Sequence, residues 1–300
     1  MFIVDAHLDL AYNALNHGRI LTSPLAAIRA AEPDKPGPRG VATVSLPELR
    51  AAGVRLVFGT LFVMPAGVTA VADDTLVYTN QNEAYSLASR QLDYYQQLAD
   101  EVDYVRLVTR QADLDWVIAS HATAEPALGI VPLMEGADPV RAPEELELWY
   151  ERGLRLIGPA WANTRYAAGA GYGRGGFTPD GYQLLEAMAD FGFILDVTHL
   201  SEQAVLEALD RYEGPLAASH SNCQTLVPGE RQLNDTQIRR LGERDGVIGV
   251  VLFNRFLRRD YRRGDPKARV TLDHVVAHID HICQVLGDAA HVGIGSDLDG

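Results

Sequence analysis

FILDVTHLSEQAVLEALDRYEGPLAASH, residues 193–220, contains two short apolar runs separated by one amphipathic run. The runs at 193–199 and 215–220 do not alternate between apolar and polar residues, which is typical of strands covered on both faces. Between them, Ser201 precedes a stretch that ends near Tyr212, as expected of a helix with a serine N-cap. The segment therefore predicts a strand, a helix and a second strand of the kind found in parallel sheets.

Similar apolar runs recur along the chain and alternate with helical patterns. Eight strands alternating with helices predict an α/β fold, a (β/α)8 TIM-type barrel, with a doubly wound open sheet as the alternative. No GxGxxG or GxxxxGKS/T motif follows the first strand, which argues against a nucleotide-binding sheet. The other predicted strands lie around Ile3 and at 56–63, 128–134, 154–161, 247–253 and 291–297. The predicted helices span 79–102, 142–152, 178–191, 201–212, 234–243 and 272–286.

The chain has 300 residues and no low-complexity linker, so we expect a single barrel domain over residues 1–300. The stretch AEPDKPGPRG at 31–40 is rich in Pro, Gly and charged residues and is predicted to be a surface loop. A barrel usually carries a helix after its eighth strand. Because the chain stops at Gly300, we expect this closing helix to be absent from it.

Charge and composition exclude several function classes. The 40 acidic and 26 basic residues give a net charge of −14, which argues against binding to nucleic acid, and two cysteines are too few for a disulfide framework. The first ten residues contain no Lys or Arg, unlike a signal peptide, and Gly and Pro interrupt the longest uncharged stretch, residues 56–72. We expect a cytoplasmic protein without membrane contact, for which a homodimer is the commonest assembly.

Side chains that bind metals stand where the predicted strands end. Active sites of barrels lie at the carboxyl ends of the strands, so these side chains are expected to converge. Taken singly, each has an ordinary structural role as a hydrogen-bonded histidine or a helix cap, but together they indicate a metal site. Three histidines and two carboxylates suit zinc, and manganese or cobalt could bind to the same ligands. The metal-binding residues are His7, Asp9, Glu135, His199 and His220, and Asp297 adds a further acid at another strand end.

Two of these positions indicate specific chemistry. If Glu135 bridges two ions about 3.5–4 Å apart, a hydroxide shared by the ions would exist near neutral pH. Asp297 would then accept the proton of the attacking group and pass it to the leaving amine.

The motifs VDAHLD, MEGAD, VTHLS, SHSN and GIGSDLDG, in this order along the chain, resemble the membrane (renal) dipeptidase family, the M19-type metallopeptidases of the amidohydrolase superfamily. The resemblance implies a (β/α)8 barrel with two zinc ions that hydrolyses the amide bond of dipeptides through a hydroxide bridging the metals. It implies that His7, Asp9 and Glu135 hold one ion, and that Glu135, His199 and His220 hold the other. Asp297 matches the family's proton-shuttling residue, and Arg231 matches the arginine that binds the substrate carboxylate.

The chain departs from the family pattern after the fourth strand. Members carry a histidine there that helps to hold the substrate carbonyl oxygen, whereas this chain has GPAWANTRY, residues 158–166. Trp161 is the nearest match by position, and we expect Trp161, Asn163 or Arg165 to take part of that role. The Glu motif also carries Asp138 where many members have a histidine.

These departures keep two alternatives open. One is a related amidohydrolase that acts on a non-peptide amide or another small molecule. The other is a non-catalytic metal-binding or interaction module.

Three further features imitate functional motifs. His274, His278 and His281 have helical spacing, but no HExxH motif is present, and structural or surface roles are expected. GYGRGG, residues 171–176, lacks the Lys-Ser/Thr of a phosphate loop and is interpreted as a flexible loop over the mouth of the site. Cys223 is expected to be a buried thiol.

Overall fold

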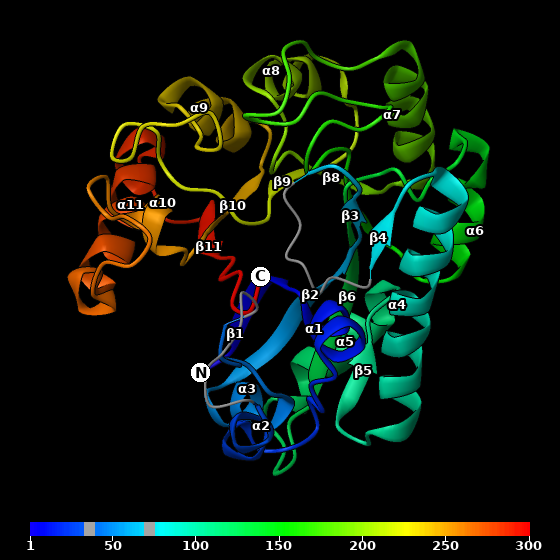
Figure 1. Ribbon diagram of the computed structural model, residues 1–300, viewed down its shortest axis with the longest axis vertical. Coiled ribbons are helices and arrows are strands. Elements are labelled where there is room, and N and C mark those ends of the chain that lie inside the picture. The colour runs from blue at the N-terminus through cyan, green and yellow to red at the C-terminus, as the bar shows by residue number, and fades with distance from the viewer. Residues whose placement is uncertain (33–39, 69–75) are drawn as a thin grey trace.

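The computed structural model describes residues 1–32, 40–68 and 76–300. Most of the loop predicted at 31–40 lies outside the described residues, as does part of the uncharged stretch at 56–72. The remaining chain is sufficient to define the barrel and the elements around it (Figure 1).

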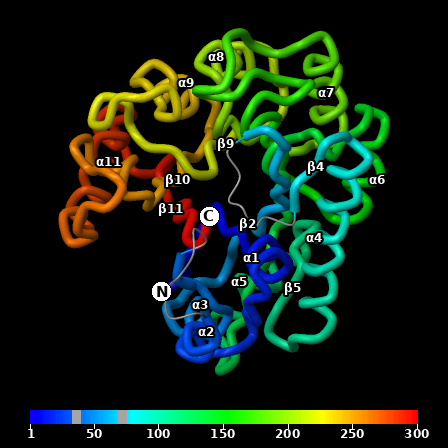
Figure 2. Tube along the Cα trace, in the orientation of Figure 1, coloured from blue at the N-terminus to red at the C-terminus, as the bar shows by residue number. Residues whose placement is uncertain are grey.

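Eight parallel strands close a barrel within the described residues. β1 pairs with β2 on one side and with β11 on the other. From β11, each barrel strand pairs with the barrel strand that precedes it in the chain, as far as β6, and β2 pairs with β6 to close the ring. This confirms the TIM-type barrel and excludes the open sheet. Figure 2 shows the C-terminal segment beside the N-terminal strand, where β11 meets β1. The strands are β1 (Ile3–Leu8), β2 (Val54–Phe62), β6 (Leu128–Glu135), β7 (Leu156–Gly158), β8 (Ile194–Asp196), β9 (Leu216–Ala218), β10 (Val247–Val250) and β11 (Val292–Ile294).

All eight predicted strands are present, although most are shorter than their apolar runs. Three short strands lie outside the barrel's closed ring. β5 (Val105–Leu107) pairs with the start of β6, while β3 (Met64–Pro65) pairs with β4 (Val77–Tyr78). The residues after the barrel strands form loops at the carboxyl end, and these loops carry the candidate site.

The predicted helices are found, with ends set by side-chain caps. Asn80, Thr178, Ser201 and Asn234 each accept a hydrogen bond from a backbone N–H in the first turn of the helix that follows. The predicted helices are α4 (Gln81–Glu101), α6 (Leu146–Glu151) after the 3-10 turn Pro143–Glu145, α7 (Pro179–Phe191), α8 (Glu202–Arg211), α9 (Asp235–Glu243) and α11 (Leu272–Leu286). The helices not predicted are α1 (Leu10–His17), α2 (Leu25–Ala31), α3 (Leu46–Ala51), α5 (Gln111–Ser120) and α10 (Asn254–Leu257).

Close packing of backbone fixes the end of β9 against its neighbours. A Cβ atom at Gly249 or at Gly295 would collide with the carbonyl oxygen of Ser219. The amide of Ser221 also donates to the carbonyl of Gly249 at 2.7 Å. Glycine at these two positions therefore lets β10 and β11 approach the residue that precedes His220.

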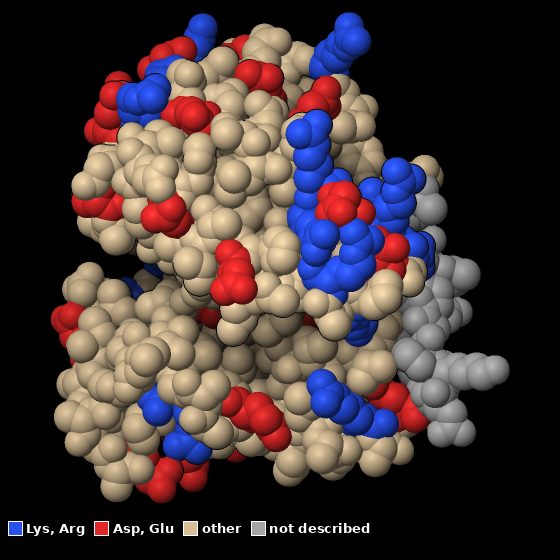
Figure 3. Space-filling model, turned by 90° about the vertical axis from the view of Figure 1, so that its left-hand side faces the viewer, with Lys and Arg blue, Asp and Glu red and all other residues tan. Residues whose placement is uncertain are grey.

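The surface carries its charges unevenly. Figure 3 faces the side on which α9, α10 and α11 lie, and Lys and Arg gather on part of it. The segment 255–269, on this side, contains seven basic and two acidic residues, so the acidic excess of the molecule lies elsewhere. In the described ranges, none of the helices has the length and apolar character needed to cross a membrane.

Candidate active site

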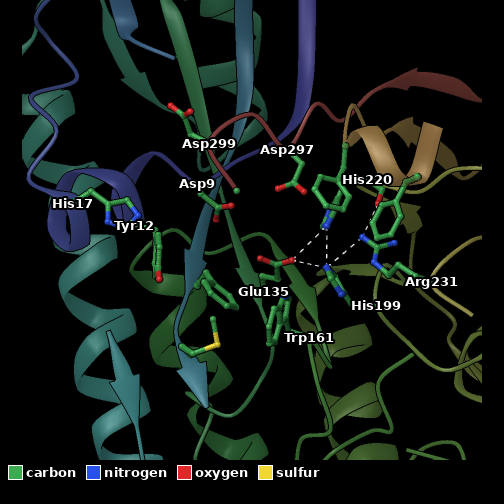
Figure 4. Close-up of a pocket in the computed structure, with 15 residues that line it drawn as sticks. Asp9, Tyr12, His17, Glu135, Trp161, His199, His220, Arg231, Asp297 and Asp299 are labelled. Carbon is green, nitrogen blue, oxygen red and sulfur yellow. Dashed lines mark hydrogen bonds and ion pairs between the residues drawn. The ribbon is translucent and has the colours of Figure 1, made fainter. Parts of the chain in front are cut away.

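The carboxyl ends of five strands bring the predicted ligands together, and all of them except the fully buried His7 line one cavity (Figure 4). Glu135, at the end of β6, lies in the middle of the group. Its Oε2 is 3.6 Å from Nε2 of His7, and its Oε1 is 2.9 Å from Nε2 of His199 and 3.5 Å from Nε2 of His220. One carboxylate thus faces histidines on two sides, as a bridging ligand must.

The donor atoms are spaced as metal ligands. His7, Asp9 and Glu135 form one group whose donor atoms lie within 4.8 Å of one another, and Glu135, His199 and His220 form a second. These groups contain the same residues as the two predicted ligand sets. The sequence pattern and the geometry therefore agree on which side chains could share a cation.

The surroundings of His7 test whether a cation would fit. Its Nε2 atom is buried and has no hydrogen-bond partner among the described residues, although it lies 3.9 Å from Asp9 and 3.8 Å from Asp297. Burial opposes a charge on this ring, but the negative charges of Glu135, Asp9 and Asp297 outweigh burial and raise the pKa of His7 to about 10. The residues present therefore fit a positively charged group at this point.

Three of the candidate ligands, Glu135, His199 and His220, are in the protonation states that metals require. Although burial opposes it, the charge of His7 and hydrogen bonds from His199 and His7 hold the pKa of Glu135 below its ordinary value, so this side chain stays a carboxylate. Burial, reinforced by the charge of Arg231, lowers the pKa of His199 to about 4. Burial and the charge of His7 also lower the pKa of His220. Both rings keep a lone pair available for a metal.

Two residues of the site have strained backbones. His199 has φ 67° and Asp297 has φ 56°, in the left-handed region that residues other than glycine rarely adopt. Such conformations persist where the surrounding structure enforces them, and they gather at functional sites. Here the turn at each strand end aims the side chain into the cavity. Burial raises the pKa of the Asp297 carboxyl to about 6, which suits a proton acceptor near neutral pH.

A hydroxyl group orients two of the histidines. Ser219 donates its hydroxyl hydrogen to Oδ2 of Asp196 at 2.5 Å, and its oxygen lies 2.9 Å from Nδ1 of His220 and 3.3 Å from Nδ1 of His7. Because its single hydrogen is used, the oxygen accepts from Nδ1 of both rings, and Nε2 of each ring faces Glu135. The one sequence signal for this arrangement is Asp196, a carboxylate inside the apolar run at 193–199.

Other carboxylates anchor the loops that carry the ligands. Asp5 accepts hydrogen bonds from the amide of Ser296 at 2.7 Å and the amide of His7 at 3.3 Å, which ties the last strand to the first. Thr60 donates to the carboxylate of Asp9. Asp299 accepts from the amides of Thr43 and Val44 and from the Thr43 hydroxyl.

Arg231 lies in the cavity and is partly buried. Its Nη2 donates to the carbonyl of His220 at 2.8 Å and lies 3.3 Å from Nε2 of His199, while Nη1 donates to the hydroxyl of Ser221 at 3.2 Å. Its buried Nε has no partner among the described residues. Glu230 accepts from the amide of Gly171 instead of pairing with its neighbour. The guanidinium of Arg231 is therefore held beside His199 and His220.

The residues after the fourth barrel strand divide between the cavity and the adjacent loop. Trp161 lines the cavity, and its ring centroid lies 6.0 Å from that of His199. Asn163 is exposed and bonds the backbone of Gly169 and Tyr172, so the structure does not bring it to the cavity. Arg165 pairs with Asp180 at 2.5 Å.

The sequence analysis missed the apolar part of the cavity. Apolar residues near strand ends are ordinary core residues in sequence, so no pattern distinguished these positions. They are Tyr12, Phe62, Met64, Phe253 and Phe256.

The features that imitate motifs have structural roles. His278 is buried and accepts a hydrogen bond from the amide of Cys223, His281 pairs with Asp235, and His274 takes part in the capping box of α11. Cys223 is buried, as expected. The segment 171–176 borders the cavity side of the molecule through Tyr172, whose ring lies 5.7 Å from that of Trp161.

Comparison with known proteins identifies the family. Residues 1–300 match the model of the family described as Membrane dipeptidase (Peptidase family M19). The chain belongs to this family. It is therefore a metal-dependent hydrolase of the metallopeptidase class, and the resemblance found in its motifs is confirmed.

Individual relatives agree with this assignment. An uncharacterized protein in the PQQ-III 3′ region of Acinetobacter calcoaceticus is 32% identical over 217 residues, which cover 69% of this chain and 67% of the relative. The dipeptidase tcpJ of Claviceps purpurea is 35% identical over 125 residues, 42% of this chain and 28% of its own length. A metallo peptidase from Rhodobacter sphaeroides, solved with a phosphinate mimic of the dipeptide L-Ala-D-Ala, has the same fold, with a TM-score of 0.82 at 23% identity, covering 100% of this chain and 86% of that chain.

Proposed function

We propose that this chain is a zinc-dependent dipeptidase. The observation that carries the proposal is that Glu135 faces His7 on one side and His199 and His220 on the other, with Arg231 next to His199. His7, Asp9 and Glu135 would hold one ion, and Glu135, His199 and His220 the second. Bound zinc would lower the pKa of a water molecule and polarise the carbonyl of the substrate.

The residues of the chain would position the substrate and move protons. Arg231 has an unpaired buried Nε donor and would bind the terminal carboxylate of a dipeptide. Asp297, held near His7 by its left-handed backbone, would take up a proton during attack on the amide and deliver it to the leaving amine. Ser219 would keep the rings of His7 and His220 in the orientation that metal binding requires.

A second candidate function is hydrolysis of a non-peptide amide or another small molecule by the same centre. Trp161 supports this candidate, because it lines the cavity where the resemblance implies a carbonyl-binding histidine. In either reaction, manganese or cobalt could bind to the same ligands in place of zinc.

Elemental analysis of protein purified without chelators tests the proposal, followed by assays with dipeptides and non-peptide amides. We expect about two zinc ions per chain and cleavage of dipeptides that chelation abolishes and zinc restores. About one ion per chain would remove Glu135 as a bridge. Turnover of non-peptide amides alone would favour the second candidate, and no metal after zinc is added back would overturn both.

A further inference from the structure

One wall of the cavity is apolar and aromatic. Tyr12, Phe62 and Met64 line it and belong to a small buried cluster that is separate from the main core, and Trp161 packs against this cluster. The ring centroids are 5.4 Å apart between Tyr12 and Phe62 and 5.1 Å apart between Phe62 and Trp161. We call these four residues the aromatic wall.

The Tyr12 end of the aromatic wall and Arg231 lie on different sides of the candidate ligands, and Trp161 lies between them. In Figure 4, Tyr12 and His17 lie on one side of Glu135 and Arg231 lies on the other, with Trp161 next to Glu135. Phe256 lies near the guanidinium, with its ring centroid 5.5 Å from Cζ of Arg231. The cavity therefore has an anion-binding end, a centre with the metal-binding residues and an apolar end.

This order fixes the direction of a bound dipeptide. If its carboxylate binds to Arg231 and its amide lies at the centre near Glu135, its N-terminal residue extends toward the aromatic wall. We propose that the preferred substrates are dipeptides with a large apolar or aromatic N-terminal side chain, which packs against the aromatic wall. This proposal rests on the proposed dipeptidase function.

The charges around the cavity support this choice. Among the described residues that line it, Arg231 is the only Lys or Arg, and it lies away from the aromatic wall. The carboxylates of Asp9 and Asp297 are at the centre, and Asp299 is engaged by the backbone of Thr43 and Val44. A charged N-terminal side chain would lose water at the wall, whose four side chains offer it no opposite charge, whereas an apolar side chain gains by burial.

The size and the edge of the cavity are consistent with one small substrate. Its volume is about 300 Å³, at the lower end of the range for sites that bind small molecules.

The polar residue at the edge of the wall is His17, whose ring packs edge-on against Tyr12 with centroids 5.5 Å apart. Acidic N-terminal residues therefore belong in the test, because His17 is the side chain that could favour them.

The experiment compares kcat/KM for a series of dipeptides with the zinc-loaded chain. The second residue is L-Ala or D-Ala, whichever is cleaved faster, and the first is Phe, Leu, Asn, Asp, Lys or Ala. Leu and Asn are close in size and differ in polarity, so their ratio isolates the apolar contact. We expect Leu to exceed Asn by about tenfold or more, which is the discrimination that small changes in an apolar pocket provide.

Variants connect this ratio to the wall. Trp161→Ala should lower the Leu-to-Asn ratio severalfold, and Met64→Ala provides a second, independent change. Trp116→Ala is the matched control, because Trp116 is 49% exposed on α5 and does not line the cavity. Circular dichroism and thermal unfolding verify that each variant is folded, so that a lost preference can be assigned to the wall.

The outcomes separate the two proposals. A Leu-to-Asn ratio that is high in the wild type and in Trp116→Ala but reduced in the wall variants supports the substrate preference. A ratio near one, a preference for Asp or Lys, or a ratio unchanged in both wall variants overturns it while dipeptidase activity stands. If none of the dipeptides is cleaved, the proposed function fails and the preference fails with it.

Discussion

The hydroxyl oxygen of Ser219 lies 2.9 Å from Nδ1 of His220, the residue that follows it in the chain. The same oxygen is 3.3 Å from Nδ1 of His7, so one side chain fixes two candidate ligands from different strands. Removing this hydroxyl would leave both rings free to turn while the carboxylates stay in place.

We predict that Ser219→Ala lowers the zinc affinity of the chain by about 10- to 100-fold, the usual effect of removing a group that orients a metal ligand. Competition with a chromophoric chelator measures the affinity directly. Ser221→Ala is the matched control, because that hydroxyl accepts a hydrogen bond from Arg231 and lies on the other side of His220. Equal affinities for wild type and Ser219→Ala would contradict the role given to Ser219.

Arg231→Lys should raise KM for dipeptides more than it lowers kcat. A lysine cannot reproduce the two-pronged guanidinium contact with a carboxylate, and the expected loss in kcat/KM is roughly 10- to 100-fold. Dipeptide amides, which lack the carboxylate, should be poor substrates of the wild type and should lose much less in the variant. A similar loss for dipeptides and their amides would mean that Arg231 does not bind the carboxylate.

Asp297→Asn should reduce kcat by about 10²- to 10⁴-fold, the range for loss of a general acid or base, with the zinc content retained. Asparagine tolerates the left-handed backbone that Asp297 adopts at φ 56°, so the fold should be preserved. Asp297→Ala should lose the same activity and, in addition, unfold at a lower temperature. Normal kcat in a folded, zinc-loaded Asp297→Asn variant would exclude Asp297 from proton transfer.

His278 should make the free energy of unfolding depend on pH. Burial, with smaller effects of His274 and His281, lowers the pKa of His278 to about 4, against 6.5 for an unperturbed histidine. Between these values the unfolded chain binds a proton that the folded chain does not, so stability is full above about pH 6.5 and falls by about 1.4 kcal/mol per unit as pH decreases toward 4. Urea unfolding at pH 7.5 and pH 5 should show a smaller loss for His278→Gln than for wild type, and equal losses would refute this contribution.

Gly295→Ala should destabilise the barrel, because the added Cβ would collide with the carbonyl oxygen of Ser219. Overpacking of this kind typically costs about 1–3 kcal/mol, and here it would also displace the backbone before His220. Gly293→Ala on the same strand is the control, since its Cβ would meet only a side-chain atom of Val247 at 3.9 Å. Similar unfolding midpoints in urea for the two variants would argue against the close approach.

Local patterns were sufficient to predict the barrel. Strands covered on both faces form continuous apolar runs, and caps such as Asn234 and Ser201 mark helix starts, so both signals are local in sequence. The helices that were missed, such as α1 and α3, are short, and α1 has no side-chain cap. Their formation depends on packing against the barrel, which a single sequence does not reveal.

The polar part of the site was also predictable, because His7, Asp9, Glu135, His199 and His220 each end an apolar run. The aromatic wall was not, since Phe62 and Met64 have the same appearance in sequence as core residues. Nor was the left-handed backbone of His199, because most histidines have ordinary backbone angles and the sequence does not mark the exceptions. For Asn163 the sequence suggested a role in the site that the structure does not show. This polar residue follows the fourth barrel strand, but it forms hydrogen bonds within its own loop.

The pairing of β1 with β11 has a consequence for how the centre assembles. His7 and Asp297 approach within 3.8 Å although 290 positions separate them in the chain, and the remaining candidate ligands come from strands distributed between them. No single supersecondary unit contains three of the candidate ligands, so the centre can form only when strands from distant parts of the chain have come together. Tight zinc retention would then report the assembly of these strands, and local opening of β1 away from its neighbours would withdraw the ligands His7 and Asp9.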